Sequence, residues 1–157
     1  MNRPPSVVDR SILVNASASR VLAAFFEPEA LAAWWQTVRS VTAPRALGVF
    51  AVEWIPTIER DDLLGRLGGV FHGTVMDYKP GRELFVADAW WLPPDGDPIG
   101  PMSLQISCTP EATGCRLRIR QSGFEDSPRW QRYYRIIDSG WRSSMDELKR
   151  YVEAADR

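Results

Sequence analysis

The sequence predicts an α+β domain in which a curved antiparallel sheet of about six strands wraps around a long C-terminal helix. Three observations support this prediction. Apolar residues recur with helical spacing near the C-terminus, two central segments carry the alternation and turn residues of β-hairpins, and two short helical segments follow an early strand. The length of 157 residues is ordinary for one domain, so we expect a single domain over residues 1–157.

The N-terminal part of the chain predicts one strand and then two short helices. Residues 7–14 (VVDRSILV) are rich in β-branched residues and predict the first strand. Ser17 or Ser19 can cap a helix over residues 18–26, and residues 29–35 (EALAAWW) predict a second helix.

The middle of the chain predicts a strand, a loop and a hairpin. Residues 47–55 predict the second strand, and residues 56–69 a loop of mixed charge. Residues 70–78 and 84–91 predict the next two strands, and residues 79–82 (KPGR) predict a type II turn between them because Gly takes positive φ without strain. The opposing residues of this hairpin should be Phe71 with Trp90, Val75 with Val86, and Asp77 with Leu84.

A second hairpin is predicted over residues 102–109 and 115–121, after a Pro/Gly-rich loop over residues 92–101 that should not join a ladder. A turn centred on Glu111-Ala112 would pair Cys108 with Cys115, Ile106 with Leu117, and Leu104 with Ile119. The other face would carry Ser103, Gln105, Ser107, Arg116, Arg118 and Arg120. This separation predicts a sheet that is covered on one face.

The C-terminal segment predicts the long helix. Ser127 can cap it and Pro128 suits its first turn. Apolar residues then follow at spacings of 4, 3, 4, 4, 3 and 4, namely Trp130, Tyr134, Ile137, Trp141, Met145, Leu148 and Val152. Gly140 interrupts this helix and suggests close approach by the sheet, a neighbouring helix or a ligand.

Several short motifs occur in an order that resembles a known family. They are residues 21–25 (VLAAF), residues 27–35 (EPEALAAWW), Gly73-Thr74-Val75 with Pro80, Leu84 and Trp90, and Gly140-Trp141 with Met145 and Leu148. Together they resemble the family of the activator of heat-shock protein 90 ATPase, within the START-like or birch-pollen-allergen-like (SRPBCC) superfamily. The resemblance implies the helix-grip fold, with a cavity between the sheet and the long helix.

Bulky aromatic residues are abundant, with seven Trp, six Phe and four Tyr. They can fill a core or line a cavity. We expect the ligand-binding residues to be Trp35, Phe50, Trp54, Phe71, Trp90, Tyr134, Ile137 and Trp141. Tyr134 is the candidate to hydrogen-bond a ligand through its hydroxyl.

Composition argues against several other functions. The net charge of −1 lacks the basic excess of proteins that bind nucleic acid through phosphates. No signal peptide or membrane span is predicted, so the expected compartment is the cytoplasm. Cys108 and Cys115 lack the spacing of zinc or redox motifs and should be buried thiols, with a disulfide as the alternative. We expect no metal and no cofactor.

Catalytic residues are not predicted. His72 is the only histidine, and the hairpin register places it away from the cavity. Asp77 and Asp88 share the covered face in that register, where a carboxyl group could act as an acid, although both could also be solvated at strand ends. The row of Arg116, Arg118 and Arg120 suggests either a solvated sheet face or a surface for an anionic partner.

Three functions are therefore considered. The first is binding of a small apolar or aromatic molecule without catalysis, and burial of its apolar surface would drive affinity. The second is an enzyme of the cyclase or hydratase kind that uses Asp77, Asp88 or Tyr134. The third is a chaperone-associated or regulatory module that binds a protein partner through an exposed apolar patch.

Overall fold

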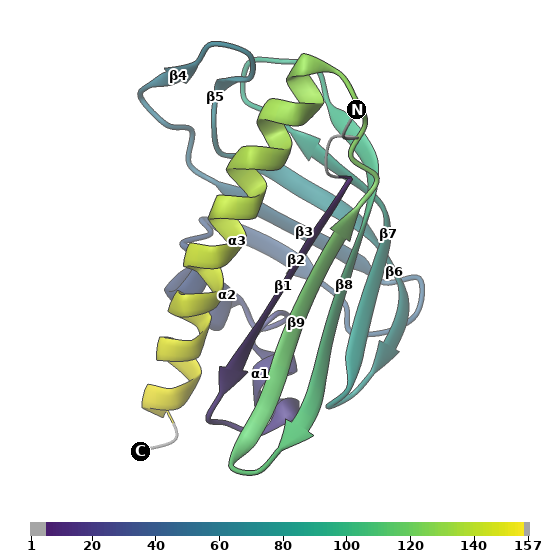
Figure 1. Ribbon diagram of the computed structural model, residues 1–157, viewed down its shortest axis with the longest axis vertical. Coiled ribbons are helices and arrows are strands. Elements are labelled where there is room, and N and C mark those ends of the chain that lie inside the picture. The colour runs from purple at the N-terminus through teal and green to yellow at the C-terminus, as the bar shows by residue number, and fades with distance from the viewer. Residues whose placement is uncertain (1–5, 156–157) are drawn as a thin grey trace, which may run out of the picture.

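A seven-stranded antiparallel sheet curls around one long helix (Figure 1). The computed structural model describes residues 6–155. The prediction that no signal peptide is present concerns the N-terminus, and residues 1–5 of that region lie outside the described part. The strands of the main sheet are β1 (Val7–Val14), β2 (Arg39–Thr42), β3 (Val49–Trp54), β6 (Gly69–Lys79), β7 (Glu83–Leu92), β8 (Ile99–Glu111) and β9 (Gly114–Ser122). Their spatial order is β1-β9-β8-β7-β6-β3-β2.

A small second sheet and three helices complete the described chain. The second sheet pairs β4 (Arg60–Asp61) with β5 (Gly65–Arg66). The helices are α1 (Ala18–Ala23), α2 (Pro28–Trp35) and α3 (Pro128–Ala155). The predicted α+β helix-grip architecture is confirmed, including the two short helices after the first strand.

The helices begin and end where local chemistry favours it. The Ser17 hydroxyl accepts a hydrogen bond from the Arg20 amide at 3.2 Å and caps α1. The Ser127 hydroxyl accepts one from the Trp130 amide at 3.1 Å and caps α3 in the same way. Helix α2 ends at Gln36, whose φ of 57° turns the chain out of the helix.

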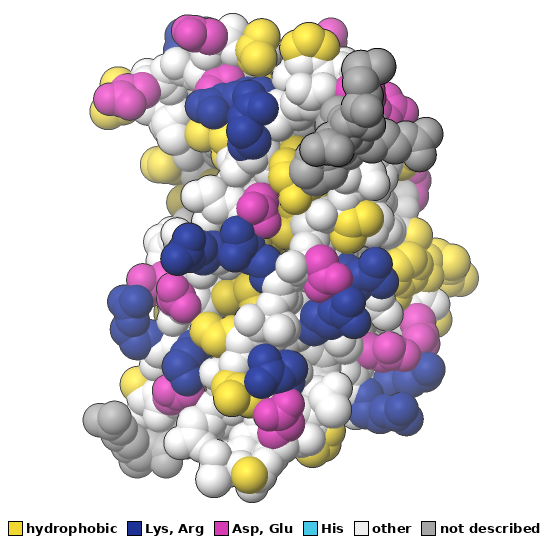
Figure 2. All heavy atoms as spheres, viewed as in Figure 1, with side chains coloured by type: hydrophobic (Ala, Val, Ile, Leu, Met, Phe, Trp, Pro, Cys, Tyr) yellow, Lys and Arg dark blue, Asp and Glu magenta, His cyan; other side chains and the backbone are white. Residues whose placement is uncertain are grey.

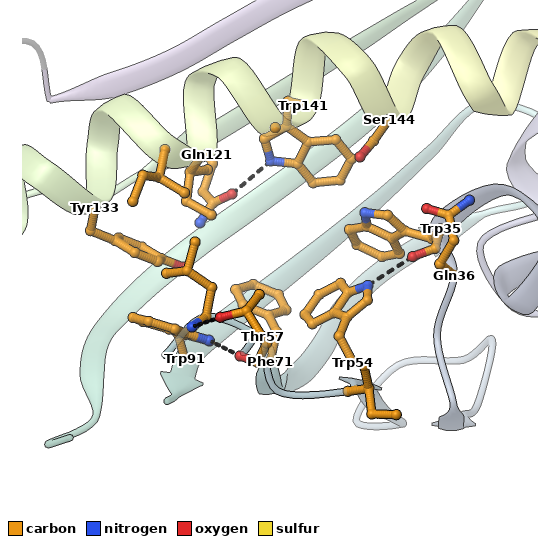
Figure 3. A pocket seen from close by; sticks show the side chains of 16 residues that line it. Trp35, Gln36, Trp54, Thr57, Phe71, Trp91, Gln121, Tyr133, Trp141 and Ser144 are labelled. Atoms are coloured by element: carbon orange, nitrogen blue, oxygen red, sulfur yellow. Dashed lines mark hydrogen bonds between the residues drawn. The ribbon is translucent and has the colours of Figure 1, made fainter. Parts of the chain in front are cut away.

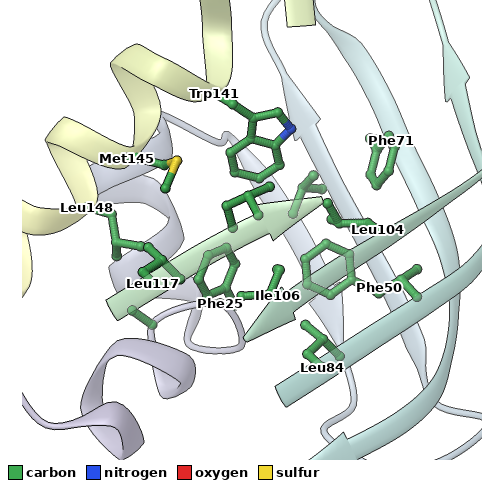
Figure 4. Close-up of a cluster of buried hydrophobic side chains, with 14 of the residues drawn as sticks. Phe25, Phe50, Phe71, Leu84, Leu104, Ile106, Leu117, Trp141, Met145 and Leu148 are labelled. Carbon is green, nitrogen blue, oxygen red and sulfur yellow. The ribbon is translucent and has the colours of Figure 1, made fainter. Parts of the chain in front are cut away.

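The apolar stripe of α3 packs onto the concave face of the sheet. Its C-terminal half buries Trp141, Met145, Leu148 and Val152 against strand residues such as Leu117 (Figure 4). Burying a side chain of this size contributes roughly 1.5–3 kcal/mol. The periodicity that predicts the helix therefore also fixes which side faces the sheet.

Two bulges in the β6–β7 hairpin change which residues point inward. The turn itself is confirmed, since the Arg82 amide donates to the Lys79 carbonyl at 2.9 Å and Gly81 has a φ of 71°. Val75 opposes Val86 as predicted, but the register shifts on both sides of this pair. Phe71 therefore lies opposite Trp91 rather than Trp90, and Asp77 lies opposite Phe85 rather than Leu84.

The β8–β9 hairpin is two residues out of the predicted register. Glu111 pairs with Gly114, so the turn is Ala112-Thr113, and Cys108 opposes Leu117. Ile106 pairs with Ile119, and Leu104 pairs with Gln121. A shift of two keeps each residue on its face, so the predicted separation of apolar and polar faces is retained.

Other segments differ from the prediction. Strands β2, β4 and β5 have four, two and two residues, which is too short for a clear alternation. Residues 99–101 join β8 although a loop was expected, and Ile99 pairs with Trp91. Pro101 fits the strand because it lies between Ile99 and Met102, where the pairing with β7 is irregular.

Candidate functional site

A cavity of about 340 Å³ lies between the N-terminal half of α3 and the sheet (Figure 3). That volume is at the lower end of the range for small-molecule sites. The sixteen lining residues come from α2, β3, β6, β7, β9 and α3, and from the loops that follow α2 and β3 and precede β6. They are Trp35, Gln36, Trp54, Ile55, Thr57, Leu67, Gly68, Phe71, Trp91, Gln121, Tyr133, Ile136, Ile137, Gly140, Trp141 and Ser144.

Hydrogen bonds donated by indole N–H groups hold three rings of the cavity wall in place. Trp54 donates to the carbonyl of Trp35 at 2.9 Å, which also satisfies a carbonyl at the end of α2. Trp91 donates to the carbonyl of Gly68 at 2.7 Å, and its ring stacks on Tyr133 with centroids 5.0 Å apart. Trp141 donates to the side-chain oxygen of Gln121 at 2.8 Å. These walls are preformed, so a ligand would not have to order them.

Trp35 lies where three other rings meet. It stacks on Trp34 at 4.8 Å, contacts the edge of Trp54 at 5.1 Å, and lies 5.1 Å from Trp141. Trp35 therefore connects α2 to the rings of β3 and α3 at this end of the cavity.

Gln121 and Tyr133 form the polar part of the opposite end. Gln121 is 2 % exposed and lies between Trp141 and Tyr133 (Figure 3). Burial raises the pKa of Tyr133 above its ordinary value, and a hydrogen bond with Gln121 offsets only part of that rise. The Tyr133 hydroxyl therefore stays protonated at neutral pH.

The lining carries no charge. Among the described residues, the cavity lining contains no Asp, Glu, Lys, Arg or His. No cluster of His, Cys, Asp or Glu within residues 6–155 has the arrangement of a metal site. The cavity is thus suited to an uncharged molecule, because a buried charge would lack a partner.

The segment that carries β4 and β5 forms one wall of the cavity mouth. Its base is tied by Thr57, whose hydroxyl accepts from the Leu67 amide at 2.9 Å. Its tip is fixed to α3 by Asp61, which accepts from Arg132 at 2.7 Å. Burial opposes the charge on Asp61, but Arg132 and the amides of Leu63 and Leu64 outweigh it and lower the pKa of this carboxyl group.

A second ion pair fixes the same segment to the loop before β8. Asp95 accepts from Arg66 at 2.8 Å and lies 3.4 Å from Arg60. The hydrogen bond from Arg66 lowers the pKa of Asp95 to about 2. The β4–β5 hairpin is therefore held to α3 and to the loop before β8 through two carboxylates that are charged at neutral pH.

Five of the eight residues expected to bind a ligand line this cavity, and three do not. Trp35, Trp54, Phe71, Ile137 and Trp141 are among the lining residues. Phe50 is 0 % exposed and lies in the core beside Phe26. Trp90 lies on the other face of β7, where its indole N–H donates to Asp88 at 3.0 Å. Tyr134 lies outside the cavity and donates to the carbonyl of Val7 at 3.4 Å.

Trp91, Tyr133 and Gln121 line the cavity in place of these three residues. Trp91 is adjacent to Trp90, and the bulge after Val86 exchanges their faces. Tyr133 fits the helical spacing from Trp130 as well as Tyr134 does. Gln121 continues the inward alternation of β9, so a polar residue in the covered face was visible in the sequence.

The two carboxylates considered for acid chemistry lie outside the cavity lining. The expectation that Asp77 and Asp88 share the covered face is wrong, because the bulges turn both outward. Half of the Asp77 side chain is exposed, near Lys79 at 3.5 Å. Asp88 is exposed and has a φ of 49°. His72 alternates with Phe71 and lies outside the cavity lining, as predicted.

The two cysteines are buried, and arginines of the predicted row form ion pairs with acidic side chains. Cys108 and Cys115 are buried and free, so the prediction of two thiols is confirmed over the disulfide. Arg118 forms an ion pair with Asp9 of β1 at 2.7 Å, and Arg116 with Glu111 at 2.9 Å. Basic and acidic side chains are intermixed on the visible face of the molecule (Figure 2).

Gly140 lies at the edge of the cavity and is exposed. A methyl group added to it would meet no atom within 4 Å, so no part of the described chain approaches it closely. Because Gly140 lines the cavity mouth, the approach of a ligand remains one of the expected explanations for a glycine at this position.

Among residues 6–155, no helix combines the length and the apolar composition needed to cross a bilayer.

Comparisons with solved structures support the architecture. Protein MLL2253 from Mesorhizobium loti is 22% identical, covers 96% of this chain and 99% of its own, and has a TM-score of 0.73. Protein CV1439 from Chromobacterium violaceum is 24% identical over 95% of this chain and 99% of its own, with a TM-score of 0.67. DynU16, from the dynemicin biosynthetic locus, is 19% identical over 97% of this chain and 49% of its own, with a TM-score of 0.67.

No curated protein matches this sequence. The model of one family does match, over residues 15–153, which include α1, the cavity lining and nearly all of α3. Since this match covers most of the chain, the protein belongs to the family of Activator of Hsp90 ATPase homolog 1-like proteins.

Proposed function

We propose that the protein binds a small apolar or aromatic molecule in the cavity between the sheet and α3. The observation that carries this proposal is an open space of about 340 Å³ whose wall contains four tryptophans held in fixed orientations. Apolar area buried on binding would contribute roughly 25 cal/mol per Å² before the costs of association. The fold supports the proposal as architecture alone, because one fold hosts many functions.

Native mass spectrometry of the purified protein and a thermal-shift screen test this proposal. The screen would contain neutral aromatic compounds and aliphatic compounds of similar size. We expect a bound mass or a concentration-dependent rise in the melting temperature, because a ligand that binds only the folded state stabilises it. The absence of both over a broad library would contradict the proposal.

Gly140 and Ser139 provide a matched pair of variants for the site. Both residues are exposed and adjacent on α3, but only Gly140 lines the cavity. Gly140→Leu should narrow the mouth and weaken binding of a compound found in the screen by at least about tenfold. Ser139→Leu should leave its affinity unchanged. Equal affinities for both variants would place the ligand elsewhere.

The cyclase or hydratase alternative has less support. Of its candidate residues, Asp77 and Asp88 are turned toward solvent and Tyr134 lies outside the cavity. An acid or base must come within hydrogen-bond reach of its substrate. Turnover of a bound compound that is lost in Asp77→Asn or Asp88→Asn would nevertheless favour the enzyme.

The protein-interaction alternative keeps one supporting observation. Apolar side chains are exposed on the outer face of neighbouring strands β2, β3 and β6, at Val41 (63%), Val49 (42%) and Met76 (48%). Such a patch can be a docking surface. A pull-down that recovers no partner, or one whose binding survives Val41→Glu, would count against this alternative.

A further inference from the structure

Hydrogen bonding at the inner end of the cavity has a fixed direction. An indole N–H can only donate, so the atom of Gln121 that faces Trp141 at 2.8 Å must be the carboxamide oxygen. The amide nitrogen of Gln121 is then directed to the other side, where it contacts the sulfur of Met102 at 3.3 Å and the hydroxyl of Tyr133.

That direction determines what Tyr133 can offer. An amide NH₂ group only donates, so the side of Gln121 that faces Tyr133 cannot accept the proton of its hydroxyl, and this proton remains to be donated. Within residues 6–155, no acceptor is found for this proton. Tyr133 is 2 % exposed and lines the cavity, so an acceptor on a ligand in the cavity can receive this proton.

The indole N–H groups of the cavity wall differ from the Tyr133 hydroxyl. The indole groups of Trp54 and Trp91 are already satisfied by backbone carbonyls. The cavity thus offers one hydroxyl donor, at Tyr133, together with the faces of aromatic rings.

We infer that the ligand is an uncharged, planar aromatic molecule that carries a carbonyl-type oxygen, and that Tyr133 donates a hydrogen bond to this oxygen. This inference rests on the proposed function and specifies the ligand for the same cavity. The rings of Trp54, Trp91 and Trp141 would contact the aromatic plane, and the absence of charged lining residues excludes anions and cations. Gln121 acts as a positioning residue, because it turns the Tyr133 proton toward the ligand.

Fluorenone and fluorene make a suitable probe pair, because they share a three-ring skeleton and differ in one carbonyl oxygen. Equilibrium dialysis would measure their affinities for the wild-type protein, for Tyr133→Phe and for the control Tyr134→Phe. We expect the wild type to prefer fluorenone by about tenfold. Tyr133→Phe should abolish this preference and still bind fluorene, whereas Tyr134→Phe should keep it.

Each outcome separates this inference from the proposed function. Equal binding of both compounds by the wild type, or a preference that survives in Tyr133→Phe, would overturn the inference and leave the cavity as an apolar site. Binding of neither compound would overturn the inference, whereas the proposed function would fall only if the library screen also found no ligand. Retained binding of fluorene by Tyr133→Phe also shows that this variant is folded. Fluorene-9-carboxylate should not bind, and tight binding of this anion would contradict the requirement for an uncharged ligand.

Discussion

Two thiols buried between β8 and β9 show how strongly an apolar environment controls a single group. Cys108 is 4 % exposed and Cys115 is 1 % exposed. Burial, with a smaller effect of Cys115, raises the pKa of Cys108 from 9.0 to about 12. Since the folded value lies above the unfolded one, this thiol favours the folded state fully below about pH 9 and loses that effect as pH rises toward 12.

We therefore predict that both cysteines of the native protein resist modification. At pH 8, the reaction with 5,5′-dithiobis(2-nitrobenzoate) should be at least about a hundredfold slower than in 6 M guanidinium chloride, because only the thiolate reacts. Absorbance at 412 nm measures the rate. Rapid labelling of the native protein would show that the thiols are accessible.

The cavity wall shows what single residues disclose before a structure is known. The helical and strand periods assign Trp35, Trp54 and Trp141 to the covered side, so their place at the cavity was predictable. Trp91 could not be distinguished from Trp90, because a one-residue bulge reverses the faces and leaves no clear mark in the sequence. Tyr133 and Tyr134 both fit the helical stripe, and only packing against Trp91 selects Tyr133.

At the scale of the element, α3 is stabilised by its packing and weakened at one position. It spans 28 residues and carries Gly140 near its middle, where the backbone has more conformational freedom than at any other helical residue. No atom lies within 4 Å of a methyl group placed there. The glycine is therefore not required for packing within the described chain.

Gly140→Ala should stabilise the protein by up to ~1 kcal/mol, because alanine loses less backbone entropy in a helix. This corresponds to a rise of about 2–4 °C in the melting temperature. Urea denaturation with an unchanged m-value would measure it. Ser139→Ala, at the exposed neighbouring position, should give about half the gain, and a loss of stability in Gly140→Ala would reveal a contact at this site.

Element order was predictable because each long element carries its own signal. The Pro-Gly turn after β6, the alternation in β9 and the stripe of α3 each specify one element. Registers were less predictable, since they depend on the bulges that curve the sheet. Strand β2 was missed because its four residues form an edge strand with little apolar content.

At the scale of the whole molecule, charged side chains connect the mouth segment to the elements on either side of the cavity. Arg132 of α3 holds Asp61, and Asp95 of the loop before β8 holds Arg66. The Asp61 side chain is only 8% exposed, which favours a stronger interaction than a solvated ion pair provides. These contacts therefore restrain the segment beside the cavity mouth.

Arg132→Gln should loosen the mouth segment without unfolding the protein. We expect hydrogen exchange at residues 57–67 to become several-fold faster, while exchange in β8 and β9 stays unchanged. Arg150→Gln is the matched control, because its ion pair with Glu147 lies on the same helix and its side chain is 72% exposed. Equal exchange in wild type and Arg132→Gln would show that Asp61 does not restrain the segment.

Four of the seven tryptophans line the cavity, and two of them lie 5.1 Å from Trp35. Indoles at such separations exchange excitation energy, so light absorbed by one ring is shared with its neighbours. A bound compound that absorbs in the near ultraviolet would accept this energy by transfer and quench the fluorescence of these tryptophans. Tryptophan fluorescence would thus report occupancy of the cavity without any attached dye.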